Sequence, residues 1–142
     1  MKRKNIVFYV FLFIGLTVLI VVANLNFGKD SSIRRSFQKT VLKPGEIITV
    51  TLDVSVKGDE SYYAIEEHIP VGWVVTEDAG GATVDSNILK WVIIQDAQDI
   101  EYTYDVQAPS QAGSYDFEGI YMFENFNEPK TNKGDTIINI IP

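Results

Sequence analysis

The chain contains no cysteine and only one histidine, His68. The absence of cysteine excludes a disulfide framework, a thiolate metal site and a cysteine nucleophile. A lone histidine gives no metal site built from several histidines and no sign of a catalytic triad. No glycine-rich loop joins a strand to a helix, so nucleotide binding is not indicated either. The sequence thus predicts no catalytic, cofactor-binding or metal-binding residues, and we expect a protein that is not an enzyme.

Charge is absent from one long apolar stretch near the N-terminus. Residues 6–23 are uncharged, and the basic sequence KRK stands directly before them. Such a run is typical of a transmembrane helix, and the preceding cations keep its N-terminal side in the cytoplasm. We expect a cytoplasmic stub at residues 1–5, a signal-anchor helix in the lipid bilayer at 6–23, and a single-pass membrane protein. The alternative is a cleaved signal peptide ending at residues 21–23, VVA, and both interpretations export the remainder.

The exported remainder is strongly acidic. All nineteen acidic residues follow the apolar run, together with nine of the twelve basic residues, which gives a net charge of −10. Such a domain repels nucleic acid and anionic membrane surfaces. An exported domain without cysteine argues against a eukaryotic secreted module and favours a prokaryotic cell surface. The expected partners are other envelope proteins or glycans, and nucleic acid is not expected.

After the apolar run the pattern changes to short alternating segments. Residues 24–35 are a polar linker, and we place one extracytoplasmic domain at residues 36–142. Segments 47–56, 100–106 and 114–123 alternate between apolar and polar residues, as half-buried strands do. Their expected inward residues are Ile48, Val50, Leu52, Val54 and Val56, then Ile100, Tyr102, Tyr104 and Val106, then Tyr115, Phe117, Tyr121 and Phe123.

The number and spacing of these segments define the fold class. We count about seven or eight short strands separated by turn residues such as Pro44 and Gly45, with no helical period beyond the apolar run. This pattern predicts an all-β protein, an antiparallel immunoglobulin-like β-sandwich preceded by one transmembrane helix. A β-barrel is the alternative architecture.

Several motifs together resemble a known family. The order LKPGEIITVTLDVSV, EEHIPVGW, LKW, YTYDVQAPSQAGSYDFEG and KGDTIINI is similar to an immunoglobulin-like β-sandwich repeat of archaeal and bacterial cell-surface proteins. The resemblance covers about residues 36–142. It implies a β-sandwich in a secreted or cell-wall protein, sometimes beside carbohydrate-active or scaffold domains. It implies no particular activity.

One residue contradicts the strand pattern. Glu67 shares its parity with Tyr63, Ile65 and Ile69, so it is predicted on the inward face, where an ionised carboxylate is costly unless it is paired. Two other polar residues stand between apolar neighbours, Lys39 on the first strand and Asn139 on the last. A lysine, an asparagine and a glutamate that meet in an apolar core have the chemistry of a spontaneous isopeptide bond, because burial lowers the pKa of lysine and raises that of glutamate.

Simpler interpretations of the same residues remain open. In the first, Glu67 pairs with an arginine. In the second, it reaches solvent at a bend. In the third, a bulge shifts the register, so that Glu66 takes the inward position instead. Lys39 extends its ammonium group to water, and Asn139 bonds to backbone.

The function that the sequence favours is a non-enzymatic structural, adhesion or protein-interaction module at a prokaryotic cell surface. The alternative is a carbohydrate-binding or accessory module of a secreted or envelope system. That alternative requires an exposed row of aromatic side chains, for which the candidates are Tyr62, Trp91 and Tyr121. Tryptophan in a β-sandwich is otherwise a core residue, which is the expectation for Trp73 and Trp91.

Overall fold

A computed structural model describes residues 30–76 and 80–142 of the chain. The expected cytoplasmic stub at 1–5 and the expected signal-anchor helix at 6–23 lie outside these described residues. Within the described ranges, no helix has the length and apolar character needed to cross a membrane. The unit Ser31–Pro142 folds as a β-sandwich.

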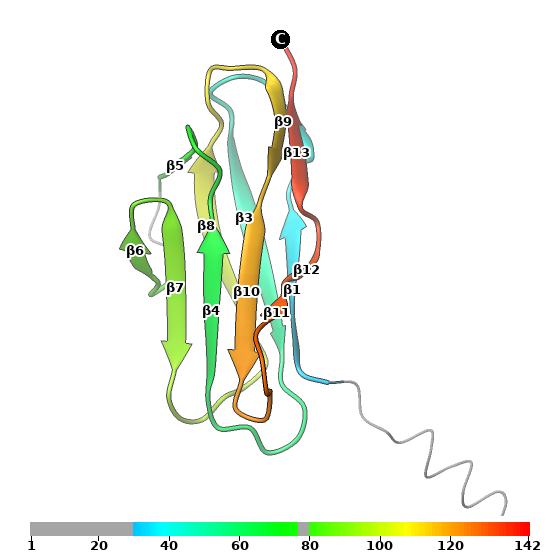
Figure 1. Ribbon diagram of the computed structural model, residues 1–142. Coiled ribbons are helices and arrows are strands. Elements are labelled where there is room, and N and C mark those ends of the chain that lie inside the picture. Colours follow the sequence, from blue (N-terminus) through cyan, green and yellow to red (C-terminus); the bar gives the residue numbers. More distant parts are fainter. Residues whose placement is uncertain (1–29, 77–79) are drawn as a thin grey trace, which may run out of the picture. The chain divides into compact units, whose positions relative to one another are not determined.

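The described residues form three sheets (Figure 1). The first sheet contains, in spatial order, β12 (Lys133–Gly134), β1 (Ser32–Phe37), β3 (Ile47–Ser55), β8 (Ile100–Gln107) and β5 (Val74–Val75). The second contains β11 (Lys130–Thr131), β10 (Glu118–Phe123), β4 (Tyr63–His68), β7 (Ile88–Ile93) and β6 (Thr83–Asp85). The third and smallest contains β2 (Val41–Leu42), β13 (Ile137–Ile140) and β9 (Gly113–Asp116).

The predicted all-β sandwich is confirmed. The first and second sheets form its two layers, and in the described part the pairings are antiparallel except those of β1 with β12 and β2 with β13. The described residues contain thirteen strands where seven or eight were expected. The difference arises because long predicted strands are broken where the chain leaves one sheet for another, and because several edge strands have only two residues.

The core is built by the alternation of the central strands. On β3 the residues Ile48, Val50, Leu52 and Val54 are all buried, as predicted, and the predicted inward residue Val56 is partly buried against them. On β8 the predicted residues Tyr102, Tyr104 and Val106 are buried, and on β10 so are Tyr121 and Phe123. The prediction for Ile100 was wrong, because it is the first residue of β8, at the end of the sandwich, and is 44% exposed.

The first strand begins earlier than predicted. The expected linker reached residue 35, but β1 starts at Ser32 and pairs with β3 from Ser32 to Phe37. The strand then stops, and β2 resumes at Val41 in a different sheet. Lys39 lies in the break between β1 and β2, so the parity that placed it on the inward face of one continuous strand does not apply.

The predicted strand at 114–123 is also split. It divides at Phe117, whose backbone N–H donates to the carbonyl of Thr136 at 2.7 Å. Before this residue, β9 pairs with β13 in the third sheet; after it, β10 pairs with β4 in the second sheet. The buried ring of Phe117 therefore sits where the chain crosses between sheets.

The register fixes which ends of the strands lie together. Ser32 at the start of β1 is opposite Ser55 at the end of β3, and Tyr63 at the start of β4 is opposite both Ile93 and Phe123. The loop 56–62 joins the end of β3 to the start of β4. The chain thus enters the sandwich at the end where β4 begins and where β7 and β10 finish (Figure 1).

Leu52 offers a test of this core. It is fully buried on a central strand, so Leu52→Ala is expected to lower the free energy of unfolding by about 2–5 kcal/mol through lost burial and a residual cavity. Ile47→Ala on the same strand, where the side chain is 51% exposed, serves as the control and should change it by less than about 1 kcal/mol. Urea unfolding of the full chain in non-ionic detergent, followed by fluorescence of the buried Trp73 and Trp91, measures both. Equal losses for the two variants would contradict the assigned register.

Candidate functional site

Glu67 is paired with an arginine in the core. It is fully buried on β4, and its carboxylate accepts two hydrogen bonds from the guanidinium of Arg35 on β1. Nε lies 2.9 Å from Oε2, and Nη2 lies 2.7 Å from Oε1. This two-point geometry is the strongest form of an arginine–carboxylate contact. Because β1 and β4 belong to different layers, the ion pair joins the two sheets across the core.

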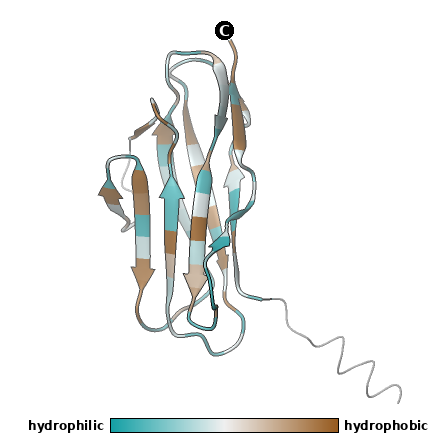
Figure 2. Ribbon diagram, viewed as in Figure 1, coloured by the Kyte–Doolittle hydropathy of each residue, from teal (hydrophilic) through white to brown (hydrophobic). Residues whose placement is uncertain are grey.

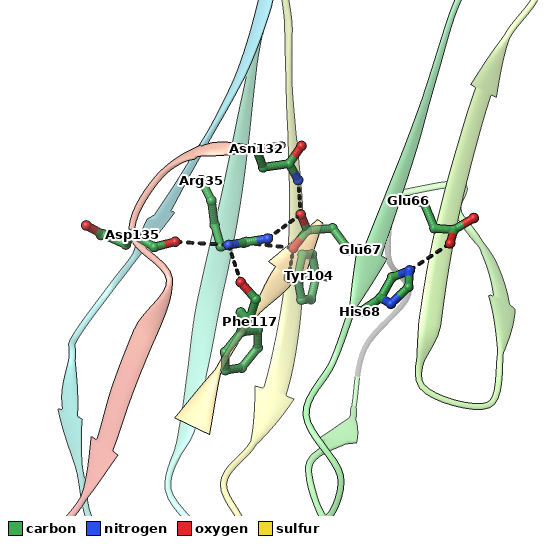
Figure 3. A network of polar contacts seen from close by, with 8 residues as sticks. All are labelled: Arg35, Glu66, Glu67, His68, Tyr104, Phe117, Asn132 and Asp135. Atoms are coloured by element: carbon green, nitrogen blue, oxygen red, sulfur yellow. Dashed lines mark hydrogen bonds and ion pairs between the residues drawn. The ribbon is translucent and has the colours of Figure 1, made fainter. Parts of the chain in front are cut away.

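The remaining polar atoms of the pair are also occupied (Figure 3). The hydroxyl of Tyr104 on β8 donates to Glu67 Oε2 at 2.8 Å, and Nδ2 of Asn132 donates to Oε1. Arg35 Nη1 donates to the backbone carbonyls of Phe117 at 2.7 Å and Asp135 at 3.0 Å. A buried ion pair is tolerated only when such additional hydrogen bonds replace the lost water.

The environment holds the donors in their protonated forms. Burial acts to lower the pKa of Arg35, but the hydrogen bond and the charge of Glu67 outweigh it, and the pKa lies above its ordinary value. Burial raises the pKa of the Tyr104 phenol well above its ordinary value, and the neighbouring Glu67 carboxylate raises it further. Arg35 therefore stays charged and Tyr104 stays a neutral donor over the physiological pH range.

Gly119 on β10 leaves the space that the cluster fills. A Cβ atom at this position would lie 2.3 Å from both Asn132 Nδ2 and Glu67 Oε1, and 2.7 Å from Arg35 Nη2. Any side chain here would displace the cluster. Asn132 Oδ1 is buried and has no hydrogen-bond partner among the described residues, and Asn132 also lines a cleft of about 460 Å³ that opens beside β10.

The three residues considered for an isopeptide bond are not brought together. Glu67 is in the core, but Lys39 is exposed, with its ammonium group paired to Glu46. Asn139 is also exposed, and its backbone N–H donates to the carbonyl of Thr40. Because the reaction needs all three groups in one apolar environment, the geometry does not support it. Of the simpler interpretations of Glu67, the structure shows its pairing with an arginine.

Glu66 occupies the outer face, as uninterrupted register requires. β4 pairs with β7 and β10 at every residue from Tyr63 to His68, so no bulge shifts it. Glu66 Oε1 contacts Nε2 of His68 at 2.7 Å, and its Oε2 lies 3.1 Å from Nζ of Lys90. The His68 and Lys90 contacts lower the pKa of Glu66 below its ordinary value.

Arg35 and Asn132 were both missed as functional residues. Arg35 fell in the expected linker, although Ile33, Arg35 and Phe37 share one parity and the first two are buried. That alternation was a usable signal. Asn132 stands between two strands of only two residues each, which carry no period, so the sequence held no comparable signal for it.

The aromatic row suggested for a carbohydrate site is not formed by its three candidates. Trp91 and Tyr121 are each only 2% exposed, and the Trp91 ring packs against Tyr102 and Tyr104 in the core. Tyr62 alone of the three is exposed. The expectation that both tryptophans are core residues is confirmed.

The outer face of the second sheet carries an exposed apolar surface. In the register of the sheet, Met122 on β10, Ala64 on β4 and Val92 on β7 form one cross-strand row. All three are exposed, Val92 by 66%. Neighbouring exposed apolar residues extend this row. We call the whole surface the outer apolar patch, and its members are Tyr62, Ala64, Val92, Ile94, Ile120 and Met122.

The patch is hollowed and lies at one end of the sheet. Two shallow grooves of about 240 and 250 Å³ cross it, and both are lined by Ala64, Val92 and Met122. It covers the end where the chain enters the sandwich. In Figure 2 the corresponding end of β7 is brown, and those of β4 and β10 carry brown and pale bands. Toward the middle of the sheet it is bounded by Glu66, His68 and Lys90. Exposed apolar patches with a polar border mark interaction sites.

No protein-family model matches the chain, and no curated protein matches it. The resemblance to a cell-surface repeat family therefore stays a prediction. Among solved structures, the chain is similar to BslA, described as a bacterial hydrophobin, with a TM-score of 0.51 and 11% identity over 80% of this chain and 95% of that one. This likeness concerns the fold, a β-sandwich.

Two further structures align less closely. One is a type II cohesin domain from the cellulosome of Acetivibrio cellulolyticus, with a TM-score of 0.41 and 11% identity over 79% of this chain and 95% of that one. The other is the reeler domain of human F-spondin, with a TM-score of 0.45 and 8% identity over 79% of this chain and 91% of that one.

The ion pair can be tested by a double-mutant cycle. Glu67→Leu leaves the Arg35 guanidinium buried without its partner, so it is expected to cost about 3–5 kcal/mol of unfolding free energy. Arg35→Met should cost a similar amount, because it leaves the Glu67 carboxylate buried without its cationic partner. The double variant Arg35→Met/Glu67→Leu should cost much less than the sum of the two, since neither charge then remains in the core. Urea unfolding measures all three; additive losses would contradict a direct pair.

A second test concerns the space beside the pair. Gly119→Ala should destabilise the fold by about 1–3 kcal/mol, because the new methyl group overlaps three polar side chains. Glu118→Ala changes the adjacent, exposed residue and should have little effect. The same unfolding measurement compares them, and an unchanged Gly119→Ala protein would show that the cluster is looser than described.

Proposed function

We propose that the chain is a membrane-anchored, extracytoplasmic β-sandwich module that acts by non-enzymatic protein interaction at a prokaryotic cell surface. Residues 6–23 supply the anchor, the basic stub before them stays in the cytoplasm, and the domain lies outside. The uncharged run and the cations directly before it support this topology.

The observation that carries the interaction role is the outer apolar patch. Its side chains include Val92 on β7 and Ile94 just after it, which are 66% and 79% exposed. The other face of this sheet packs on the core. Folding does not require them to be apolar, whereas binding does. The likeness in fold to BslA, described as a bacterial hydrophobin, is consistent with a surface role for a sandwich of this kind.

The alternative role, glycan binding, has weaker support. A sugar-binding face needs several exposed aromatic rings, and two of the three candidates are in the core. Tyr62 remains exposed, but it stands among aliphatic side chains in the outer apolar patch. An aliphatic environment of this kind is more typical of a contact with another protein than of a sugar-binding face.

Both parts of the proposal can be tested in intact cells that make the full chain with a C-terminal tag. Protease added outside should degrade the tag without lysis. Formaldehyde should give tagged adducts heavier than the monomer. The variant Val92→Ser/Met122→Ser should lose most of these adducts and remain folded, because both side chains are exposed.

A matched control changes the opposite face of the sandwich. Thr103→Ser, at an exposed position of β8, should keep the adducts. A tag that is protected until lysis would overturn the topology. Adducts that persist unchanged in the Val92→Ser/Met122→Ser variant would overturn the role of the patch.

A further inference from the structure

The geometry points to a second copy of this chain as the occupant of the outer apolar patch. The two copies form a parallel dimer whose twofold axis is parallel to β4 and lies just outside its outer face. This inference rests on the proposed function, because it uses the anchor at residues 6–23. It adds the identity of the partner and the arrangement of the two molecules.

The order of side chains across the patch fits such an axis. The row reads Met122, Ala64, Val92 over β10, β4 and β7, so a small side chain stands between two larger ones. Rotation by 180° about this axis places Met122 of one copy against Val92 of the other, and it brings the two Ala64 residues face to face. The large side chains then fill the grooves beside the small one, and the surface is complementary to itself, as a twofold interface must be.

The charged side chains beside the patch are also compatible with the same side chains of a second copy. The next row reads Ile120, Glu66, Lys90 across the same three strands. About the same axis, the Glu66 carboxylates lie centrally and a lysine from each copy flanks them, with His68 close by. The face is thus locally balanced in charge, although the whole exported part carries −10.

The position of the patch selects this axis from the other twofold axes. The patch lies on the side of the sandwich, at the end where the chain enters. An axis parallel to the strands keeps the two entry points at the same end of the dimer, which suits two chains anchored in one membrane. An axis across the strands would put the two entry points at opposite ends.

Lipid is a poorer occupant on the same grounds. The patch lies on the outer face of a sheet and not on the loops at the entry end. Those loops expose carboxylates, including Asp59, Asp96 and Glu128, which repel anionic headgroups. Six side chains are few beside the roughly 20–30 residues a side of a stable interface. The contact is therefore weak in solution and gains from the effective concentration that a shared membrane gives.

Single cysteines test the arrangement directly, because the chain contains none. The full chain is placed in phosphatidylcholine vesicles, and flotation of the vesicles reports anchoring independently of dimer formation. Under mild oxidation, Ala64→Cys should yield mainly disulfide-linked dimer. Thr103→Cys, exposed on the opposite sheet, should stay near background.

The axis itself predicts a pairing rule. Met122 and Val92 stand on either side of β4, at about one strand spacing of 4.8 Å each. A mixture of Met122→Cys and Val92→Cys chains should therefore cross-link better than Met122→Cys alone. Adding Met122→Glu to Ala64→Cys should reduce the dimer about tenfold or more, because it places an unpaired carboxylate in the interface. Added NaCl should increase the dimer, since it screens the repulsion between two acidic domains.

Other outcomes overturn the inference. Equal cross-linking of Ala64→Cys and Thr103→Cys in chains that float with the vesicles would exclude a specific dimer. Efficient linking of Met122→Cys alone would exclude the axis. If the intact-cell adducts that depend on the patch have a mass other than that of two chains, the partner is a different protein, and the proposed function stands without the dimer. Chains that do not float would instead contradict the anchor.

Discussion

The two layers of this sandwich are joined by a buried charged contact between Arg35 and Glu67. Sheets in a sandwich normally meet through apolar side chains alone, which pack well but specify register weakly. An ion pair in the core behaves differently. Either partner without the other is a buried charge, so arrangements that separate them are strongly disfavoured. We infer that the pair favours one arrangement of the two sheets over its neighbours.

Several irregular features of the fold converge on this contact. Phe117 and Asp135, whose carbonyls accept from Arg35, both lie where the chain changes sheets. Asn132, which donates to Glu67, stands between β11 of one layer and β12 of the other. Gly119 supplies the room. The breaks near Phe117, Asn132 and Asp135 therefore let backbone carbonyls and a loop side chain reach the guanidinium and the carboxylate.

The regular strands were easier to predict from the sequence than the residues that surround the ion pair. The strands β3 and β8 alternate regularly, and their inward residues were assigned correctly except at Ile100, because period and burial agree there. Glu67 was recognised as inward, and an arginine was one of the partners considered. The partner itself was missed because Arg35 lies at the very start of the domain, in a segment whose serines and charges suggest a linker. Asn132 depends on tertiary placement alone, which no local pattern contains.

The buried pair and the outer apolar patch are two consequences of one register. Along β4 the inward residues include a carboxylate, while the outward Ala64 belongs to an apolar row, which inverts the usual use of the two faces. A slip of one residue would expose Glu67 to solvent and turn Ala64 into the core. That slip would also move the buried Tyr63 and Ile65 to the surface, and it would leave Arg35 without its carboxylate. The apolar core and the ion pair therefore favour the same register. In that register Ala64 lies on the outer face, in one row with Val92 and Met122.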